Sequence, residues 1–540
     1  MSHISIRVDN ITKVFKSGKT GLHNCSFEIE SNTLTAILGP SGCGKSTLLK
    51  SLMGDSPQTS GRIYIEGLEL NEDNYDYIKT HIGYVPQDDI IHKDLTVEQC
   101  LNYSARLRLS DYTKESQNQR IQEVISDLGI QKIKDQLISE ISGGQRKRVA
   151  IGVEILTKPK VLFLDEPTSP LDPQTIEEFL KILKLLARSG TTVLMVTHKP
   201  EDLFYMDDCI FMGVGGYITY KGNPSQLNHY FGKTNIVEIY SLMDSIEMMN
   251  YYDLFIENHK QLSLLETNKN QFNPNRHTNF LSQTYWLTIR YLSRKLNDLG
   301  SLAIQLSQAP IIAFLVILIF KQVDQVVLFF IVISAIWFGT NNAAKEIVSE
   351  INIFKRERMY NQGIVPYLLS KIFVLSIMGF AQSAIFVFIL TENYKDTVVP
   401  ISNPILVIFW MFFITVVSTL FGLTLSVISK TTEKVMGLIP IALIPQIMFS
   451  GVMVKIIAMY VKIPSFLLVS RWAMTGLSRV QTEIYSNVDE KKHSTMEFLR
   501  TNLGETYDYF SSFEFEFFIL LVQVLFFFTL IYLFLRDKIS

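Results

Sequence analysis

The chain contains 540 residues, of which 47% are hydrophobic, and its formal net charge is −2. This length is too great for one ordinary domain and fits two or three. The near-neutral charge gives no reason to expect a nucleic-acid partner, because such a partner favours a strongly basic face.

Apolar residues are distributed unevenly along the chain. Up to about residue 280 they are mixed with charged residues, as in a soluble domain, whereas apolar runs of bilayer-spanning length begin at Leu299. All four cysteines lie in the first part, which suits a reducing cytosol. The first ten residues lack the charged-then-apolar order of a secretory signal. We therefore expect a cytosolic domain followed by a membrane domain that is inserted through its internal spans.

The first chemical motif follows a short apolar run, Leu34 to Leu38, which predicts a buried strand. The motif is a complete GxxxxGK[ST] loop made of Gly39, Pro40, Ser41, Gly42, Cys43, Gly44, Lys45, Ser46 and Thr47. Glycines let the backbone curl so that successive N–H groups face phosphate. Lys45 can then reach the β- and γ-phosphates of ATP, and the Ser46 hydroxyl can bind Mg²⁺. Cys43 fits a position for a small side chain, and the alternative is a redox-sensitive thiol near a helix N-terminus.

Two further motifs follow in the same half of the chain. The first is the segment Ser142-Gly143-Gly144-Gln145, and the second is an apolar run, Val161 to Leu164, that ends at Asp165 and Glu166. Open α/β sheets bind ligands at the carboxyl ends of their strands. Asp165 therefore suits Mg²⁺ binding, and Glu166 suits polarising the attacking water as a general base. Two acids after a strand can alternatively form a helix cap or a solvated turn, but the phosphate-binding loop upstream favours the catalytic interpretation.

These motifs, in this order, resemble those of the ATP-binding cassette (ABC) family, whose ATPase domain has an α/β P-loop NTPase fold. The resemblance implies that Phe15 stacks on adenine, although a core phenylalanine is the alternative, and that Gln87 contacts Mg²⁺ or water. It also implies that Asp172 reaches across a dimer and that His198 lies near the γ-phosphate. The catalytic residues would then be Glu166, His198, Lys45 and Gln87.

The signature segment carries the prediction about partners. In the ABC family, Ser142, Gly143, Gly144 and Gln145 would close over nucleotide that a second cassette holds, and this chain has one cassette. The basic residues Arg146-Lys147-Arg148 and the segment Tyr220-Lys221-Gly222 further resemble the G subfamily, although a basic helix is alternatively a solvated surface. The resemblance implies a half-transporter that works as a dimer. A homodimer is favoured because every hydrolytic element is present, and a heterodimer stays open.

The predicted organisation has three parts: an ATP-binding domain (1–234), a polar linker with some helix (235–282) and an all-α membrane domain (283–540). An amphipathic helix at about 285–296 would lie at the membrane surface with its cations toward the cytosol. Six spans are expected at about 299–320, 326–344, 367–391, 403–428, 435–454 and 514–535, with an outer loop at about 455–513. Pro440 and Pro445 could make the fifth span re-entrant.

Cations cluster in the connections that we place inside, which puts both termini and the ATPase domain in the cytosol. The membrane would be a plasma membrane or a bacterial inner membrane, with lipid around the spans. Between spans two and three, the spacing of Glu350, Phe354, Arg356, Glu357 and Arg358 resembles the G-subfamily helix that transmits motion from the ATPase. A solvated helix face is the alternative.

Polar residues inside spans are candidates for a substrate path, because they are costly against lipid. The candidates and their aromatic neighbours are Phe338, Thr340, Asn341, Gln446 and Phe449. Helix–helix hydrogen bonds are an equal alternative. Such a mixture would suit an amphipathic or lipid-like small molecule.

The sequence therefore predicts a dimeric exporter that uses ATP and Mg²⁺ and alternates access across the membrane. One alternative is an ABC complex that moves an outer-face partner without transporting a substrate. A soluble tandem-cassette ATPase would need two cassettes and no spans, and importers usually carry cassette and spans on separate chains.

Overall fold

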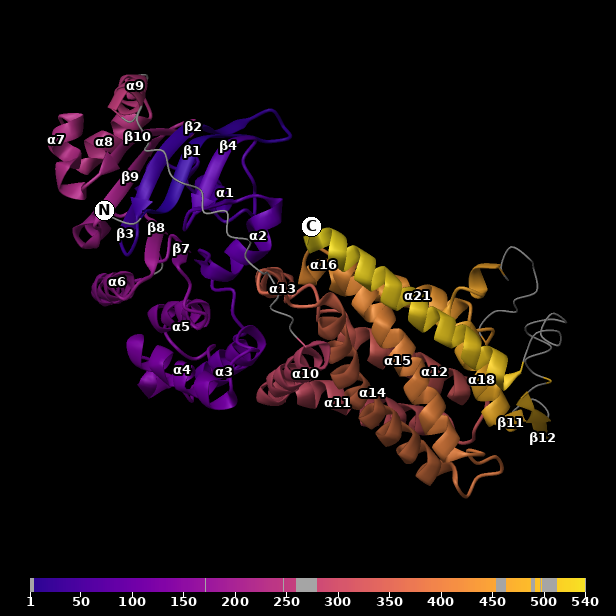
Figure 1. The fold of residues 1–540 in the computed structure, drawn as a ribbon. Coiled ribbons are helices and arrows are strands. Elements are labelled where there is room, and N and C mark those ends of the chain that lie inside the picture. Colours follow the sequence, from indigo (N-terminus) through magenta and orange to yellow (C-terminus); the bar gives the residue numbers. More distant parts are fainter. Residues whose placement is uncertain are drawn as a thin grey trace. The chain divides into compact units, whose positions relative to one another are not determined.

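The structure is a computed structural model that describes residues 4–169, 171–245, 247–258, 279–452, 463–486, 491–495, 497 and 512–539. The chain divides into two compact units. Unit 1 comprises Met1–Asn279 with Met359–Asn361, and unit 2 comprises Phe280–Arg358 with Gln362–Ser540. Unit 1 combines strands and helices, whereas unit 2 is mainly helical (Figure 1).

Unit 1 contains two sheets, with strand orders β2-β1-β4-β5 and β10-β9-β3-β8-β7-β6. In the larger sheet, β3, β8, β7, β6 and β9 pair in parallel, and β10 pairs antiparallel with β9. The strands are β1 (Ile4–Val14), β2 (Thr20–Glu30), β3 (Leu34–Leu38), β4 (Ser60–Ile65), β5 (Leu68–Glu69), β6 (Ile82–Val85), β7 (Val161–Asp165), β8 (Thr192–Val196), β9 (Asp208–Gly213) and β10 (Tyr217–Gly222).

Helices connect and cover these strands. The α-helices are α1 (Lys45–Leu52), α2 (Glu72–Ile78), α3 (Val97–Arg108), α4 (Lys114–Asp127), α5 (Gly143–Ile155), α6 (Pro173–Arg188), α7 (Leu227–Phe231), α8 (Ile236–Met243) and α9 (Met248–Asn258). The 3-10 helices among the described residues are η1 (Lys79–His81), η2 (Gln131–Ile133), η3 (Pro200–Tyr205) and η4 (Pro224–Gln226). The region expected as a linker holds α8, α9 and the start of α10, and its residues 259–278 lie outside the described residues.

The central strands form because their sequences are apolar throughout. All five residues of β3 and of β8 are buried, as are the first four of β7, which suits strands with both faces covered. The predicted strand at 34–38 is confirmed, and the runs that begin at Val161 and Thr192 are also strands. Parallel pairing places the loops that follow β3, β7 and β8 at one edge of the sheet.

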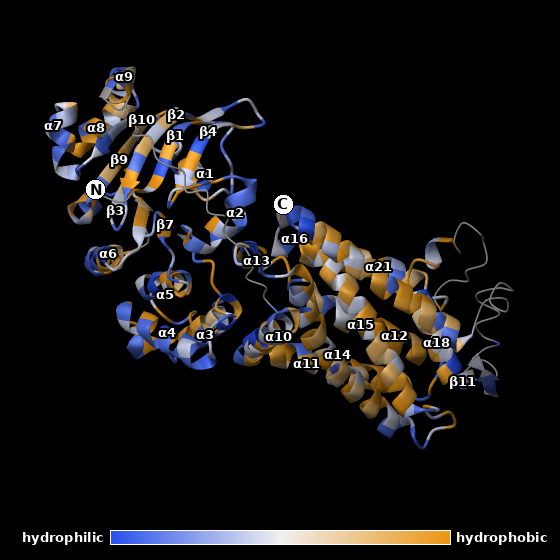
Figure 2. Cartoon of the chain, in the orientation of Figure 1, coloured by the Kyte–Doolittle hydropathy of each residue, from blue (hydrophilic) through white to orange (hydrophobic). Residues whose placement is uncertain are grey.

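Unit 2 is built from long apolar helices, which Figure 2 shows as mainly hydrophobic ribbons. Its elements are α10 (Phe280–Asn297), α11 (Leu299–Ile319), α12 (Gln325–Ala343), α13 (Ile351–Arg358), α14 (Ile364–Tyr394), α15 (Pro404–Ile428), α16 (Thr432–Met448), α18 (Val469–Val480), β11 (Glu483–Ser486), β12 (Lys491–Ser494) and α21 (Phe513–Ile539). Five described helices, α11, α12, α14, α15 and α21, are long and apolar enough to cross a membrane.

The fifth predicted span corresponds to α16, a single helix of 17 residues that contains both Pro440 and Pro445. It ends at Met448, and residues 453–462 lie outside the described residues. Within unit 2, α12 packs closely on α15. A Cβ added at Gly339 would lie 2.3 Å from the Thr415 oxygen, and one at Gly422 would lie 2.6 Å from the Thr340 oxygen. Small residues at this contact let the two helix backbones approach each other.

Candidate active site

The loop between β3 and α1 curls through left-handed glycines. Gly39, Gly42 and Gly44 have φ of 145°, 79° and 113°, values that other residues rarely adopt. A Cβ at Gly44 would also lie 2.6 Å from the Gly21 oxygen. The Lys45 ammonium donates hydrogen bonds of 2.8 Å to the carbonyl oxygens of Gly39 and Pro40. The Lys45 side chain is therefore held over its own loop, on the inside of the curved loop backbone.

Cys43 is buried in this loop, with 1% of its surface exposed. Burial raises the pKa of its thiol, which outweighs the lowering effect of the nearby Lys45 ammonium. A protonated and inaccessible thiol reacts slowly with oxidants. This environment fits the interpretation of Cys43 as a small packing residue better than a redox-sensitive site.

Two side chains fit a magnesium ion beside the loop. The Ser46 hydroxyl lies 3.5 Å from Asp165 Oδ1, at the carboxyl end of β7. Burial, followed by the negative charge of Glu166, raises the pKa of Asp165, so a cation here would offset an unfavourable concentration of negative charge. Among the described residues no group of three or more His, Cys, Asp or Glu could hold a metal ion. A hydroxyl and one carboxylate match Mg²⁺ that takes its remaining ligands from phosphate and water.

Glu166 lies at the centre of a three-residue cluster. Its Oε1 is 2.5 Å from His198 Nε2, and its Oε2 accepts a 3.3 Å hydrogen bond from Gln87 Nε2. The three residues come from loops after β7, β8 and β6, which are neighbouring strands of the sheet. The cluster thus has one carboxylate that can accept a proton from water, one imidazole and one amide, all at the edge where the phosphate-binding loop also lies.

Phe15 lies outside the hydrophobic core, because 39% of its surface is exposed. It follows β1, and its backbone N–H and oxygen bond to Lys19 and Gly18 in a turn. A Cβ built on Gly21 would contact both the Phe15 ring and Thr47. The ring is therefore an accessible aromatic face close to the end of the phosphate-binding loop, as adenine stacking requires.

The signature segment begins α5 with reciprocal hydrogen bonds. The Ser142 hydroxyl accepts from the Gln145 backbone, and the Gln145 side chain accepts from the Ser142 backbone. A Cβ at Gly143 would meet nothing within 4 Å, whereas one at Gly144 would lie 2.3 Å from the Thr175 side chain. Gly144 thus packs α5 on α6, while Ser142 and Gly143 present an open surface.

Asp172 caps the helix that Gly144 contacts. Its carboxylate accepts hydrogen bonds of 3.0 and 2.6 Å from the Thr175 backbone N–H and hydroxyl. These bonds lower the pKa of Asp172, the hydroxyl having the larger effect. Asp172 therefore has a structural role within its own chain, in addition to any role across a dimer.

Lys147 is a functional candidate that sequence reasoning missed. It belongs to the basic cluster after Gln145, yet only 1% of its side chain is exposed. Its ammonium donates to the backbone oxygens of Pro86 and Gln87 at 3.2 and 2.9 Å, and lies 3.1 Å from the Asp89 carboxylate. The signature helix α5 therefore holds the loop that carries Gln87. A basic residue on a helix gives no signal that distinguishes this role from a solvated one.

The predicted coupling residues lie in unit 2 and are mostly buried. Phe354 stacks on Tyr367 at 4.1 Å between ring centroids, and Glu350, Phe354 and Arg356 are at most 7% exposed. Arg358 donates a 2.7 Å hydrogen bond to the Gln362 oxygen. The solvated-face alternative therefore does not describe this segment.

Glu350 and Glu357 pair with cations of α10. Arg294 contacts Glu350, and Arg290 binds both carboxylate oxygens of Glu357, one at 2.9 Å. Lys295 lies 2.6 Å from Glu346. The α10 cations are therefore paired with acids of the same unit rather than left on a solvated face. The helix is also longer than predicted, beginning at Phe280.

Lys371 of α14 completes this network and was not foreseen. Its ammonium is 1% exposed and lies 2.6 Å from Glu350 and 3.8 Å from Glu346. Tyr367 donates to Glu350 at 3.2 Å. Burial alone would raise the pKa of Glu346, but the ammonium groups of Lys295 and Lys371 lower it to about 2. We call these residues the charge network: Arg290, Arg294, Lys295, Glu346, Glu350, Glu357 and Lys371.

The candidate substrate-path residues divide into two sets. Phe338 packs edge-on against Phe386, Thr340 donates to the Ser418 oxygen at 3.5 Å, and Gln446 accepts a 2.9 Å bond from the Ser470 backbone. These three are buried among helices, as the helix-packing alternative expects. Asn341 and Phe449 are partly exposed, so they are the members of the set with free surface.

Both parts of the chain match known protein families. The chain matches the family described as ABC transporter over residues 22–169 and the family described as ABC-2 type transporter over residues 282–482. It is 31% identical over 469 residues to the ABC transporter ATP-binding/permease protein Rv1747 of Mycobacterium tuberculosis, covering 83% of this chain and 54% of that protein.

Other relatives belong to the G family. ABC transporter G family member 28 of Arabidopsis thaliana is 38% identical over 43% of this chain and 22% of its own length. ABC transporter G family member 1 of Dictyostelium discoideum is 37% identical over 42% of this chain and 29% of its own length. The chain therefore spans about half or less of these curated relatives. It is an ABC transporter with an N-terminal ATPase domain and a C-terminal ABC-2 type membrane domain, and its sequence is G-family-like.

Proposed function

We propose that two copies of this chain form an exporter that uses ATP hydrolysis to move an amphipathic or lipid-like small molecule outward across a plasma or bacterial inner membrane. The observation that carries the proposal is the Glu166–His198–Gln87 cluster beside the phosphate-binding loop, joined to a chain with spans of membrane length. The open surface at Ser142 and Gly143 supports a dimer, because it offers donors to nucleotide that a second copy holds.

In the proposed reaction, Phe15 stacks on adenine and the loop N–H groups with Lys45 bind the phosphates. Glu166 accepts the proton of the attacking water, while His198 and Gln87 hold the carboxylate and orient that water. Ser46 and Asp165 would hold Mg²⁺, with Gln87 near it, and the bound ion would neutralise charge on the phosphates. Asp172 and the residues from Ser142 to Gln145 would bind across the dimer. Closure and hydrolysis would then alternate access to the path near Asn341 and Phe449.

The chemical part is tested by replacing Glu166 with Gln. We expect retained binding of a fluorescent ATP analogue and a loss of hydrolysis by at least about a hundredfold, because the amide cannot accept the proton. Glu115→Gln on the exposed face of α4 is the matched control. Normal hydrolysis in Glu166→Gln would overturn the assignment of the base.

The transport part needs a separate measurement. Inside-out vesicles that contain the protein should accumulate at least one compound of an amphipathic panel when ATP is added, and vesicles with Glu166→Gln should not. Hydrolysis stimulated in nanodiscs by the same compound identifies the substrate class. Active hydrolysis with no accumulation of any compound would favour the alternative, an ABC complex that moves an outer-face partner.

A further inference from the structure

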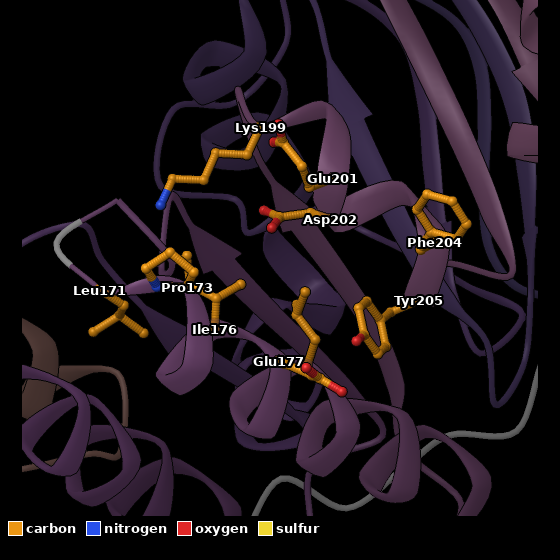
Figure 3. Close-up of a pocket in the computed structure, with 10 residues that line it drawn as sticks. Leu171, Pro173, Ile176, Glu177, Lys199, Glu201, Asp202, Phe204 and Tyr205 are labelled. Atoms are coloured by element: carbon orange, nitrogen blue, oxygen red, sulfur yellow. The ribbon is translucent and has the colours of Figure 1, made fainter.

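Unit 1 contains a cavity of about 860 Å³ that the nucleotide chemistry does not use. It lies between the start of α6, which supplies Pro173, Ile176 and Glu177, and η3, which supplies Glu201 and Asp202. Figure 3 shows these two walls with the Asp202 carboxylate between them. The cavity is large enough for a drug-sized molecule.

The polar lining is mainly acidic. Glu177, Glu201 and Asp202 contribute three carboxylates, and Lys199 contributes one ammonium. The Lys199 ammonium already donates a 2.7 Å hydrogen bond to the Thr168 oxygen, and Glu177 pairs with Lys181 at 2.6 Å. The charge left to face a ligand is therefore negative, on Glu201 and Asp202.

Asp202 has one satisfied and one unsatisfied oxygen. Its Oδ2 accepts from the Thr168 and Thr197 hydroxyls at 2.9 and 2.5 Å, whereas its buried Oδ1 has no hydrogen-bond partner. The residue has no exposed surface, so an unpartnered carboxylate oxygen here is costly. Burial also raises the pKa of the Asp202 carboxyl, because the charged form is poorly solvated there. A ligand that donated a hydrogen bond to Asp202 Oδ1, after a small adjustment of the Asp202 side chain, would remove this cost.

The remaining lining is apolar and aromatic. Leu171, Pro173, Ile176 and Leu180 come from the α6 side, and Phe204 and Tyr205 come from η3. Phe204 is 93% exposed at this site, which is unusual for a side chain of its size. An aromatic body would gain apolar contact here, while the carboxylates would bind a cationic end.

We propose that this cavity binds a small organic cation that joins an aromatic group to an ammonium or amine donor, with Asp202 and Glu201 as the anionic contacts. The position gives such a ligand a regulatory role in hydrolysis. One wall of the cavity, α6, begins directly after Asp172, which caps that helix. The other wall, η3, comes just after His198 in the chain, and His198 lies four residues before Asp202. A bound molecule that joins α6 to η3 would restrict both segments together.

The test uses dansylcadaverine, an aromatic fluorophore on a primary alkylammonium chain, with the full-length protein in lipid nanodiscs without nucleotide. We expect saturable, blue-shifted fluorescence above that of empty nanodiscs of the same lipid. Dansylamide lacks the ammonium and should bind about tenfold more weakly, as should dansylcadaverine to Glu201→Gln. Ile176→Trp, which narrows the cavity with a larger side chain, should weaken binding.

Two further readouts separate this site from the transport path. Dansylcadaverine affinity should fall as the pH is lowered through the raised pKa of Asp202, because the protonated acid loses its charge. Replacement of Asn341 or Phe449, the path residues of unit 2 with free surface, should leave the affinity unchanged. No saturable signal, or equal affinity in Ile176→Trp and the wild type, would overturn the proposal, and neither result would bear on hydrolysis by Glu166.

Discussion

Buried charges are used differently in the two units. In unit 1 they form small groups: Arg108 pairs with Glu154, Lys147 lies beside Asp89 and holds the loop of Gln87, and Asp202 joins Thr168 to Thr197. In unit 2 seven charged residues gather among α10, the Glu346–Arg358 segment and α14. We infer that loss of Lys147 displaces one residue of the candidate site, whereas a lost charge in the charge network weakens the packing of several helices.

The largest expected effect is on the stability of unit 2. Replacing Lys371 with Met removes one of the two cations that Glu350 and Glu346 each contact, and should destabilise the protein by about 1.5–3 kcal/mol. The measurement is the midpoint of denaturation in detergent. Lys395→Met, an exposed residue just after the same helix, is the control and should change little.

A double variant sharpens this prediction. Lys371→Met with Glu350→Gln also removes the acid that Arg294 contacts, so it should be less stable than Lys371→Met alone. Equal stability of the single and double variants would mean that the contact between Arg294 and Glu350 contributes nothing to unit 2.

The corresponding change in unit 1 should act mainly on activity. Lys147→Met removes the donor to Pro86 and Gln87, so the Gln87 side chain would leave its position beside Glu166. We expect hydrolysis to fall roughly 10- to 100-fold while the fluorescent ATP analogue still binds. Arg148→Met is the matched control, since its partner Glu178 lies on the exposed face of α6. Unchanged hydrolysis in Lys147→Met would remove the distinction between the two units.

A pair of glycine variants separates packing from function across a dimer. Gly144→Ala places a Cβ 2.3 Å from Thr175 and should cost about 1–2 kcal/mol of stability in unit 1. A Cβ at Gly143 meets no described atom of its own chain within 4 Å, so Gly143→Ala should keep full stability. If a second copy closes over this surface, Gly143→Ala will nevertheless reduce hydrolysis. Full activity in a stable Gly143→Ala variant would contradict that contact.

The smallest effect is expected from acidification between pH 4.5 and 2. The pKa of Glu346 is lowered from 4.5 to about 2, so its contribution to stability is complete above about pH 4.5 and is lost as the pH falls through about 2. The denaturation midpoint of Lys371→Met should fall less on acidification than that of the wild type, because Glu346 has lost one of its cations. Parallel acid profiles would show that Lys371 does not contribute to the shift.

The sequence was informative where function depends on short segments. The strands at β3, β7 and β8 are continuous apolar runs, so they were predictable, and the loops after them brought Lys45, Glu166 and His198 to one edge. The helix α11, Leu299–Ile319, also has bounds close to those expected for the first span, about 299–320. These features depend on local pattern, which a single chain displays directly.

The charge network and Lys147 could not be predicted, because their partners are distant in sequence. Arg290 and Glu357 are 67 positions apart, and nothing near Arg290 indicates its acid. The helix α16 shows a second limit: two prolines suggested a break, yet the helix continues through both. Helices in membrane domains tolerate proline when other groups satisfy the freed backbone, and that depends on tertiary context.

The backbone conformation of Glu166 lowers the stability of the fold at the residue proposed as the base. Its φ is 48°, in the left-handed region, where a residue other than glycine or asparagine is disfavoured by roughly 1 kcal/mol or more. An asparagine at this position would fit that backbone better while it removed the proposed base. The chain therefore keeps a conformational penalty at the residue proposed as the base, and a search for thermostable variants would favour Glu166→Asn, which we expect to be inactive.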